Sequence, residues 1–327
     1  MQAVDGLQPS AYLIDVAKRN IEGEISLDET RKLIDSYYQS KTVRTPKDED
    51  EEEADKVSAN IAKILASKTF AFNTNGYVSL HRRIFEGVFK HAGEIRQYDI
   101  SKKEWVLEGD SVNYLNWEDL RRALDWDIEQ EKNFQYKGLS DDEKIEHIAK
   151  FVSGIWQIHA FREGNTRTTA IFTIQYLRSL GYEVNNEMFA KHSWYFRNAL
   201  VRANYNDLQK GIHSTTKFLE LFFSNLLLGT NYELKNRYMH VDFVNENTSQ
   251  SARIETPKCQ IDTLKCTLEE LAVLDLIKKN PSVKQTELAE QTGKSVRSIK
   301  RIIDSLKEKQ YIRRVDGKRY GKWEVLV

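Results

Sequence analysis

Apolar residues recur with helical spacing through most of this chain. Ile145, Ile148, Val152 and Ile155, for example, fall on one face of a helix with 3.6 residues per turn. Glycine and proline, which end or bend helices, are scarce, with 15 and 4 residues among 327. A turn-rich all-β protein needs many more of both. The sequence therefore predicts a mainly α-helical fold.

Length and composition are typical of a soluble globular protein. A chain of 327 residues suggests two or three domains, and 49 Lys and Arg balance 49 Asp and Glu. No apolar run is long enough to span a bilayer, and the first eleven residues lack a signal-peptide pattern, so we expect no membrane association and a cytoplasmic location. Cys259 and Cys266 lack the spacing of a zinc site or a disulfide framework.

Two short helices are predicted within residues 1–45. The first ends at Gly23, and the second opens with Ser26-Leu27-Asp28-Glu29, a capping box. So small a pair cannot form a core by itself and should pack on the domain that follows. From 48 to 55, seven of eight residues are acidic. Such a run repels itself, so we predict a solvated acidic linker over residues 46–56.

The most polar segment of the central block, residues 57–232, lies between two predicted helices. It reads His159-Ala160-Phe161-Arg162-Glu163-Gly164-Asn165-Thr166-Arg167-Thr168. A helix that begins near its glycine presents free N–H groups to an anion, above all to phosphate. An arginine in its first turn adds a cationic fork.

The acidic and aromatic members of this segment also suit a phosphate site. Glu163 beside a polyphosphate could hold Mg²⁺, and His159 is a reasonable general base because the unperturbed pKa of histidine lies near neutral pH. Phe161 should be an apolar anchor for the loop. The spacing alone is equally consistent with an ordinary Gly-Asn turn between two helices.

Residues 267–327, which follow a connector over 233–266, have the pattern of a winged helix domain. A helix capped at Thr267 precedes helices near 285–292 and 295–306, and strands at 311–315 and 319–327 meet at Asp316-Gly317. From Pro281 onward there are 12 Lys and Arg against 6 Asp and Glu. The candidate DNA contacts are Lys294, Arg297, Lys300 and Arg301. Winged helices also dock proteins, so that alternative stays open.

The segment 159–168 resembles the core motif of Fic domains, HPFxxGNGR. Residues 80–85 and 91–96 upstream and 198–204 downstream resemble further parts of the Fic core, in the family's order. The resemblance covers about residues 57–228. It implies a mainly α fold: a Fic-type helical bundle with a small β-hairpin flap, here followed by the C-terminal winged helix-turn-helix domain.

The resemblance implies AMP transfer from ATP to a hydroxyl of a target protein. His159 would deprotonate the hydroxyl, Glu163 would bind Mg²⁺, and the anion hole would consist of Gly164, Asn165, Thr166 and Arg167. Phe196 and Asn204 fall where the family contacts adenosine. The flap that docks the target protein as an added strand would comprise Lys102, Lys103, Glu104 and Trp105. Family members often form homodimers, which makes a homodimer an expectation here as well.

Two departures leave the donor open. Thr166 stands where the family has glycine, and Ala170 stands where it often has a second arginine that holds the γ-phosphate. Transfer of another phosphate-containing group and removal of AMP therefore remain alternatives. So does a winged-helix DNA-binding regulator whose Fic-like block senses nucleotide, although a sensor has no need of His159.

The N-terminal helices also resemble an inhibitory module of the family. Its motif is [Ser/Thr]xxxGlu[Gly/Asn], and Lys18 to Gly23 match it except at the first position. Glu22 is thus the predicted inhibitory residue, with Arg167 as its expected partner.

Overall fold

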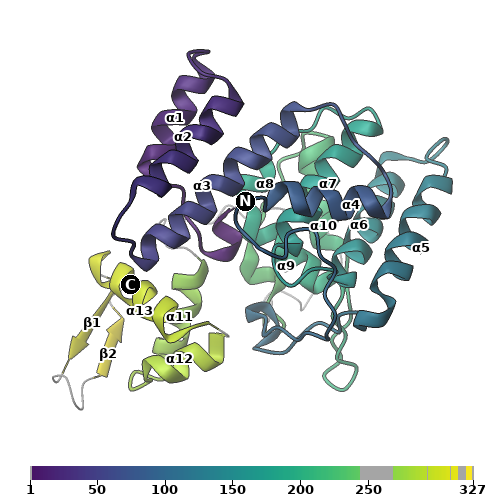
Figure 1. The fold of residues 1–327 in the computed structure, drawn as a ribbon. Helices are drawn as coiled ribbons and strands as arrows, with labels where there is room; N and C mark the ends of the chain where they lie inside the picture. Colours follow the sequence, from purple (N-terminus) through teal and green to yellow (C-terminus); the bar gives the residue numbers. More distant parts are fainter. Residues whose placement is uncertain (1, 244–267, 293, 310, 316–321, 326–327) are drawn as a thin grey trace. The chain divides into compact units, whose positions relative to one another are not determined.

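The computed structural model describes residues 2–243, 268–292, 294–309, 311–315 and 322–325. The predicted turn at Asp316-Gly317, both cysteines and the cap at Thr267 lie outside these residues. The fold is mainly helical, as predicted, and consists of two compact units (Figure 1).

The first unit comprises the chain up to residue 101 together with residues 112–235. Its elements are η1 (Gln2–Asp5), α1 (Ala11–Ile21), α2 (Leu27–Ser40), α3 (Pro46–Ala66), α4 (Thr74–Ile84), η3 (Trp117–Asp119), α5 (Leu120–Asn133), α6 (Asp141–Ile158), α7 (Asn165–Ser179), α8 (Glu187–Lys191), α9 (Ser193–Ala203) and α10 (Lys217–Leu227). The second unit comprises 102–111 and the chain from 236 onward. Its elements are η2 (Trp105–Leu107), η4 (Asn236–Met239), α11 (Leu268–Lys279), α12 (Gln285–Thr292), α13 (Val296–Glu308), β1 (Ile312–Val315) and β2 (Lys322–Val325). None of the helices described is long and apolar enough to cross a membrane.

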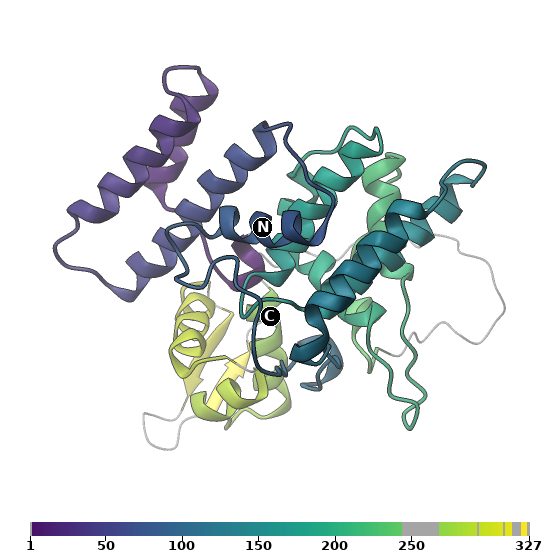
Figure 2. The ribbon, with the colours of Figure 1, turned by 45° about the vertical axis from the view of Figure 1, so that its right-hand side comes forward.

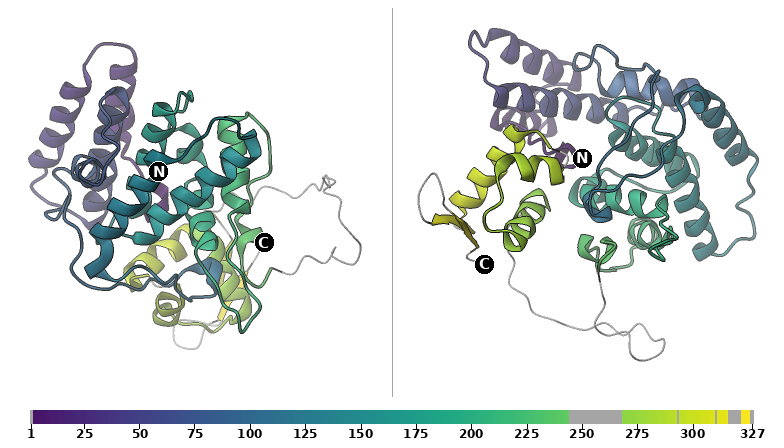
Figure 3. Two further views of the ribbon diagram at one scale, coloured as in Figure 1. Left: turned by 90° about the vertical axis from the view of Figure 1, so that its right-hand side faces the viewer. Right: turned by 90° about the horizontal axis from the view of Figure 1, so that it is seen from below.

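The two predicted N-terminal helices are confirmed as α1 and α2. The capping box forms as expected: the Ser26 backbone N–H donates to Glu29 Oε2 at 2.7 Å, and the Glu29 N–H donates to Ser26 Oγ at 3.2 Å. The pair lies beside α3 (Figures 2 and 3). Leu13, Ile34 and Tyr38 pack with Ala59 of α3 in a small core, so the pair is stabilised by its neighbour, as its size requires.

The acidic run is part of α3, so the prediction of a solvated linker is wrong. Thr45 caps the helix in a box with Asp48, and Pro46 occupies its first turn, where proline is tolerated. Acidic side chains near a helix N-terminus are stabilised by the helix dipole. Basic side chains offset the remaining repulsion, as in the Lys41–Asp48 pair at 2.6 Å. The acidic run is therefore compatible with a regular helix.

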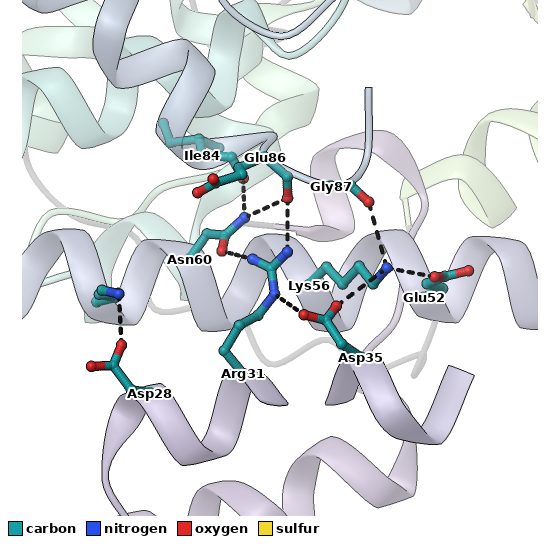
Figure 4. A network of polar contacts seen from close by, with 10 residues as sticks. Asp28, Arg31, Asp35, Glu52, Lys56, Asn60, Ile84, Glu86 and Gly87 are labelled. Carbon is teal, nitrogen blue, oxygen red and sulfur yellow. Dashed lines mark hydrogen bonds and ion pairs between the residues drawn. The ribbon is translucent and has the colours of Figure 1, made fainter. Parts of the chain in front are cut away.

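A polar network joins α2 and α3 to the end of α4 (Figure 4). Arg31 of α2 donates to Asn60 of α3 and, at 3.0 Å, to the carbonyl of Glu86. Asn60 donates to the carbonyl of Ile84 at 3.0 Å, and Lys56 pairs with Asp35 at 3.3 Å. Helices α2 and α3 are thus hydrogen-bonded to the backbone on either side of Phe85.

The centre of the first unit is α7, which is buried at every position from Asn165 to Leu177. It is preceded by α6, whose capping box at Ser140 and Glu143 forms as predicted. The loop that precedes α7 reaches the surface, since Arg162 and Glu163 are exposed.

The second unit contains the predicted winged helix fold. Its core gathers apolar side chains of α11, α12 and α13 around Trp323 of β2, including Val273, Ile277, Leu288, Ile299 and Ile303. Strands β1 and β2 pair antiparallel, with Ile312 opposite Val325 and Val315 opposite Lys322.

The predicted flap does not form β-strands in the part of the chain described. Residues 102–111 form a loop in which the Glu104 N–H donates to the Asp110 carbonyl at 2.9 Å. The 3₁₀ turn η2 and the positive φ angles of Glu108 and Gly109 fold these residues into a tight turn. They therefore do not have the extended backbone that pairing as β-strands requires. Val106 is buried and accepts a bond from the Val241 N–H at 2.9 Å. Glu104 is also buried, so it cannot present its side chain to a target.

Candidate active site

The loop between α6 and α7 is shaped by its own side chains. Asn165 accepts a hydrogen bond from the Phe161 N–H at 2.9 Å through Oδ1 and donates to the Phe161 carbonyl at 2.7 Å through Nδ2. These two bonds close the loop over residues 161–165. The asparagine thus determines where the polar segment turns into the helix.

His159 is the C-cap of α6 and adopts a left-handed backbone conformation, with φ 50°. Such a conformation in a residue with a Cβ costs on the order of 1–3 kcal/mol and needs support from its surroundings. The support includes a bond from Arg96 Nε to the His159 carbonyl at 2.8 Å. The imidazole lies against the ring of Tyr114, with centroids 4.1 Å apart, and edge-on to Trp156 at 5.2 Å. The predicted base is therefore held firmly.

Gly164, the N-cap of α7, cannot be replaced by a larger residue without a clash. Its φ is 73°, and a Cβ built on it would lie 2.2 Å from Cζ of Phe85. Phe161 is completely buried and stacks on His81 with ring centroids 3.8 Å apart. The prediction that Phe161 anchors the loop is confirmed.

His81 connects the loop to the segment after α4. Its Nδ1 accepts a hydrogen bond from the Gly93 N–H at 2.8 Å, so Nε2 is the protonated nitrogen and donates to the Glu163 carbonyl at 3.1 Å. Burial lowers the pKa of His81 to about 3, and the positive charge of Arg167 acts in the same direction, while the hydrogen bond to the Glu163 carbonyl opposes this shift. The ring is therefore neutral near pH 7, as this tautomer requires.

The N-terminus of α7 keeps its donors although Thr166 replaces the family's glycine. The Thr168 N–H makes the first helical bond, to the Gly164 carbonyl at 2.9 Å, so the N–H groups of 165–167 have no acceptor within the helix. The Thr166 hydroxyl points into the core and accepts a bond from Trp156 Nε1 at 3.0 Å. Its side chain therefore does not occupy the anion site.

Arg167 is buried, and acidic side chains from two distant segments contact it. Nε lies 2.7 Å from Oδ2 of Asp5, and Nη2 donates to Oε1 of Glu53 at 2.8 Å. Nη1 donates to Oε1 of Gln2 at 3.1 Å. Burial raises the pKa of Glu53, and the positive charge of Arg167 opposes this rise. The guanidinium of Arg167, which the sequence predicts to bind phosphate oxygens, is thus bound to side chains of the protein.

Three residues that the sequence predicts for the site make other contacts or lie elsewhere in the fold. Glu22 is exposed at the C-cap of α1, so the expected pairing with Arg167 is wrong. Phe196 is 1% exposed within an aromatic cluster with Phe189 and Phe222, which leaves no surface for adenosine. Asn204 uses Nδ2 to join the end of α9 to the Ser153 carbonyl of α6 at 3.1 Å.

The residues at this end of α7 fit a magnesium ion held largely by a nucleotide. Glu163 is exposed at the entrance to the helix N-terminus, with its carbonyl fixed by His81. Within the described residues no three His, Cys, Asp or Glu side chains form a protein-only metal site. Mg²⁺ commonly takes one or two carboxylates and completes its shell with phosphate oxygens and water, so a single carboxylate here suffices.

The position at which the family often has a second arginine has no room for one in this fold. Ala170 is completely buried within α7, where an arginine could not be accommodated without repacking. Arg167 is thus the arginine that the first turns of α7 present at the site.

The predicted DNA contacts gather on α13. Arg297, Lys300 and Arg301 are exposed and lie on one helical face, while Lys294 precedes the helix and is half-buried. A shallow groove on this face is also lined by Asp304 and Glu308. The face is basic at its N-terminal end and mixed in charge further along.

Sequence reasoning assigned no role to five residues at the site. Asp5 and Glu53 contact Arg167, His81 holds the loop, and Arg96 and Tyr114 contact His159. His81 and Arg96 do lie in the segments that carry the family resemblance. For Asp5, Glu53 and Tyr114 the linear sequence offers no comparable signal, because their importance comes from contacts across the fold.

Comparison with known proteins agrees with the domain architecture. Residues 71–177 match the Fic/DOC family, and residues 270–313 match the family "Winged helix-turn-helix DNA-binding". The chain therefore contains a Fic domain followed by a winged helix domain.

The relatives include proteins that are named as probable protein adenylyltransferases. "Probable protein adenylyltransferase Fic" of Escherichia coli is 27% identical over 118 residues, covering 36% of this chain and 55% of that protein. "Probable protein adenylyltransferase y4lH" of Sinorhizobium fredii is 29% identical over 142 residues, covering 40% and 65%. The chain thus spans little more than half the length of the first of these relatives.

Two solved structures are also similar. BepC of Bartonella tribocorum with bound AMPPNP has a TM-score of 0.44 at 17% identity, covering 56% of this chain and 88% of that one. A Fic family protein of Desulfovibrio desulfuricans has a TM-score of 0.40 at 12% identity, covering 97% and 98%.

Proposed function

We propose that this chain is a self-inhibited protein adenylyltransferase, which moves AMP from ATP to a hydroxyl side chain of a target protein. The observation that carries the proposal is the juxtaposition of His159 with the N-terminus of α7, within the region that matches the Fic/DOC family. The relatives named as adenylyltransferases support the same activity.

The residues of the loop suit each step of this reaction. The target hydroxyl oxygen attacks the α-phosphorus of ATP, its proton passes to His159, and the bond to the β-phosphate oxygen breaks to release pyrophosphate. The N–H groups of 165–167 would stabilise phosphate charge, and the guanidinium of Arg167 would add to them once an acidic partner is displaced. Glu163 would hold Mg²⁺, which neutralises phosphate charge when bound.

Self-inhibition is supported by the contacts of Arg167. The carboxyl oxygens of Asp5 and Glu53 contact the guanidinium edges that phosphate oxygens would need. A nucleotide that engages Arg167 must therefore displace at least one of them. We assign the inhibitory role to Asp5 and Glu53 in place of Glu22.

The test is intact-mass analysis after incubation with ATP and Mg²⁺, in the presence and absence of a lysate that supplies target proteins. We expect a mass gain equal to AMP, at least tenfold faster in Asp5→Ala/Glu53→Gln than in the parent. Glu22→Gly is the matched control for loss of an N-terminal acidic residue and should behave as the parent. His159→Ala in the double-variant background should show about 10²–10⁴-fold less transfer.

The outcomes separate the alternatives left open by the sequence. A mass gain other than AMP would identify a different phosphate-containing group. Loss of AMP from a modified target would indicate the reverse activity. Equal rates in the parent and the double variant would eliminate the inhibitory role of Asp5 and Glu53.

A second function, DNA binding, is favoured by the match of residues 270–313 and by the exposed cations of α13. Basic side chains on the third helix of a winged helix domain suit phosphate contacts in and beside the major groove. If no variant transfers AMP while nucleotide still binds, a DNA-binding regulator that senses nucleotide becomes the better description.

A further inference from the structure

Arg96 is a nearly buried arginine that no step of the proposed reaction uses. It is 1% exposed. Its ion-pair partner is Asp99, whose carboxylate lies 3.7 Å from Nη1 of Arg96 and is largely exposed. A buried guanidinium needs acceptors for its donors, and here backbone carbonyls supply them.

The guanidinium of Arg96 joins three separate segments. Nε donates to the His159 carbonyl at 2.8 Å, Nη1 donates to the Tyr98 carbonyl at 2.5 Å, and Nη2 donates to the Leu115 carbonyl. The backbone N–H of Arg96 also donates to the Ala160 carbonyl at 2.9 Å. One side chain therefore ties the end of α6 to the two backbone segments on either side of residues 102–111.

These contacts bear directly on the geometry of His159. Its backbone is left-handed, and the carbonyl that Arg96 holds belongs to that same residue. Leu115 follows Tyr114, whose ring packs on the imidazole at 4.1 Å. Gln157 also fixes this segment, by donating to the Asn113 carbonyl at 3.1 Å. Arg96 thus holds both the backbone of the base and the aromatic ring against it.

We infer that Arg96 is a positioning residue, which sets the orientation of the His159 imidazole through these carbonyl contacts. Its effect on catalysis rests on the proposed function, whereas its effect on the ring of His159 does not. Displacing a catalytic group by about 1 Å can cost on the order of 10²-fold in rate. Loss of Arg96 should therefore lower kcat and leave ATP binding nearly unchanged.

The test is Arg96→Lys in the Asp5→Ala/Glu53→Gln background. Lysine keeps the positive charge but cannot reach three carbonyls with one planar fork. Arg178→Lys is the matched control, because Arg178 also donates to two carbonyls of the first unit, those of Val184 at 2.7 Å and Leu65 at 2.8 Å. If the lysine variant does not fold, as judged by thermal unfolding, Arg96→Gln replaces it.

Two measurements are made on each variant. The first is kcat and the KM for ATP, where we expect kcat to fall about 10–100-fold with KM within about threefold. The second is the Hε1 proton resonance of His159 in NMR spectra, assigned by its loss in His159→Ala. This resonance should move in the Arg96 variant, because the imidazole changes its position relative to the Tyr114 ring, and should stay in place in Arg178→Lys.

The two readouts keep the two proposals distinguishable. An unchanged His159 resonance in a folded Arg96 variant overturns the inference, whatever the activity. A moved resonance with parental kcat overturns it as well, because position then has no catalytic effect. If the parent and the double variant transfer no AMP, the proposed function fails, and the resonance alone decides whether Arg96 positions His159.

Discussion

At the scale of single residues, Thr166 shows how a departure from a family motif can be tolerated. Its hydroxyl satisfies Trp156 Nε1 inside the core, while its backbone N–H remains at the helix N-terminus. The side chain serves stability and the backbone serves the site. The two roles can therefore be separated by mutation.

Thr166→Val should destabilise the protein and leave AMP transfer within about twofold of the parent. The valine leaves the indole N–H of Trp156 buried without its partner, which costs about 1–3 kcal/mol. Urea unfolding measures the first effect and intact-mass analysis the second. Loss of transfer at unchanged stability would mean that the hydroxyl acts in the site.

His81 should make stability depend on pH. The pKa of His81 is about 3 in the folded protein, whereas an unfolded histidine titrates near 6.5. The unfolded state therefore binds the extra proton between these values, and stability falls as the pH falls below about 6.5.

The comparison is the free energy of unfolding of parent and His81→Gln, measured in urea at pH 6.5 and pH 5. The contribution of His81 to the free energy of unfolding of the parent should decrease by about 2 kcal/mol from pH 6.5 to pH 5. Each pH unit corresponds to about 1.4 kcal/mol. The difference in free energy of unfolding between the parent and His81→Gln should therefore be smaller at pH 5 than at pH 6.5. A gap that stays constant would show that His81 is not held neutral.

At the scale of elements, α3 connects the N-terminal segment to the site. Asp55 is completely buried and accepts hydrogen bonds from the Ser10 N–H at 2.8 Å, the Ser10 hydroxyl at 2.6 Å and the Tyr38 hydroxyl at 2.8 Å. Glu53, two residues earlier, contacts Arg167. One helix thus holds the segment after Asp5 and supplies Glu53, the second carboxylate to which we assign the inhibitory role.

Asp55→Ala should lower stability and raise AMP transfer together. Removing the carboxylate leaves buried donors without acceptors, at a cost of about 1–3 kcal/mol for each group, and frees the segment that carries Asp5. Thr45→Ala, which removes only the cap of α3, is the matched control and should cost about 1 kcal/mol without activation. Activation of both variants to the same degree would point to general loosening instead.

At the scale of the whole molecule, the chain combines a Fic domain with a winged helix domain that has a basic face on α13. Arg297→Ala should weaken DNA binding to all sequences alike and reduce the slope of log affinity against log salt by about 1, as expected for a phosphate contact. Fluorescence anisotropy at several salt concentrations measures both. Glu308→Ala on the same helix is the control and should keep the parental slope. AMP transfer should be unaffected in either variant.

Local patterns were sufficient for much of the fold. Capping boxes at Ser26 and Ser140 act within four residues, so α2 and α6 begin where the sequence predicts. The apolar spacing of the last sixty residues likewise predicts the three helices of the winged helix fold. The motif from His159 to Thr168 identifies the loop of the candidate site, because the N–H groups proposed to bind phosphate lie in one continuous segment.

What the sequence determined by itself is therefore the helical fold, the winged helix pattern near the C-terminal end and the position of the candidate site loop. The tertiary structure decided which carboxylates contact Arg167, that the acidic run forms the packed helix α3, and that Phe196 belongs to the core. It also brought Arg96 and Tyr114 to His159. The physical reason is the separation along the chain: caps and periodicity act between near neighbours, whereas these tertiary contacts join residues tens to more than a hundred positions apart.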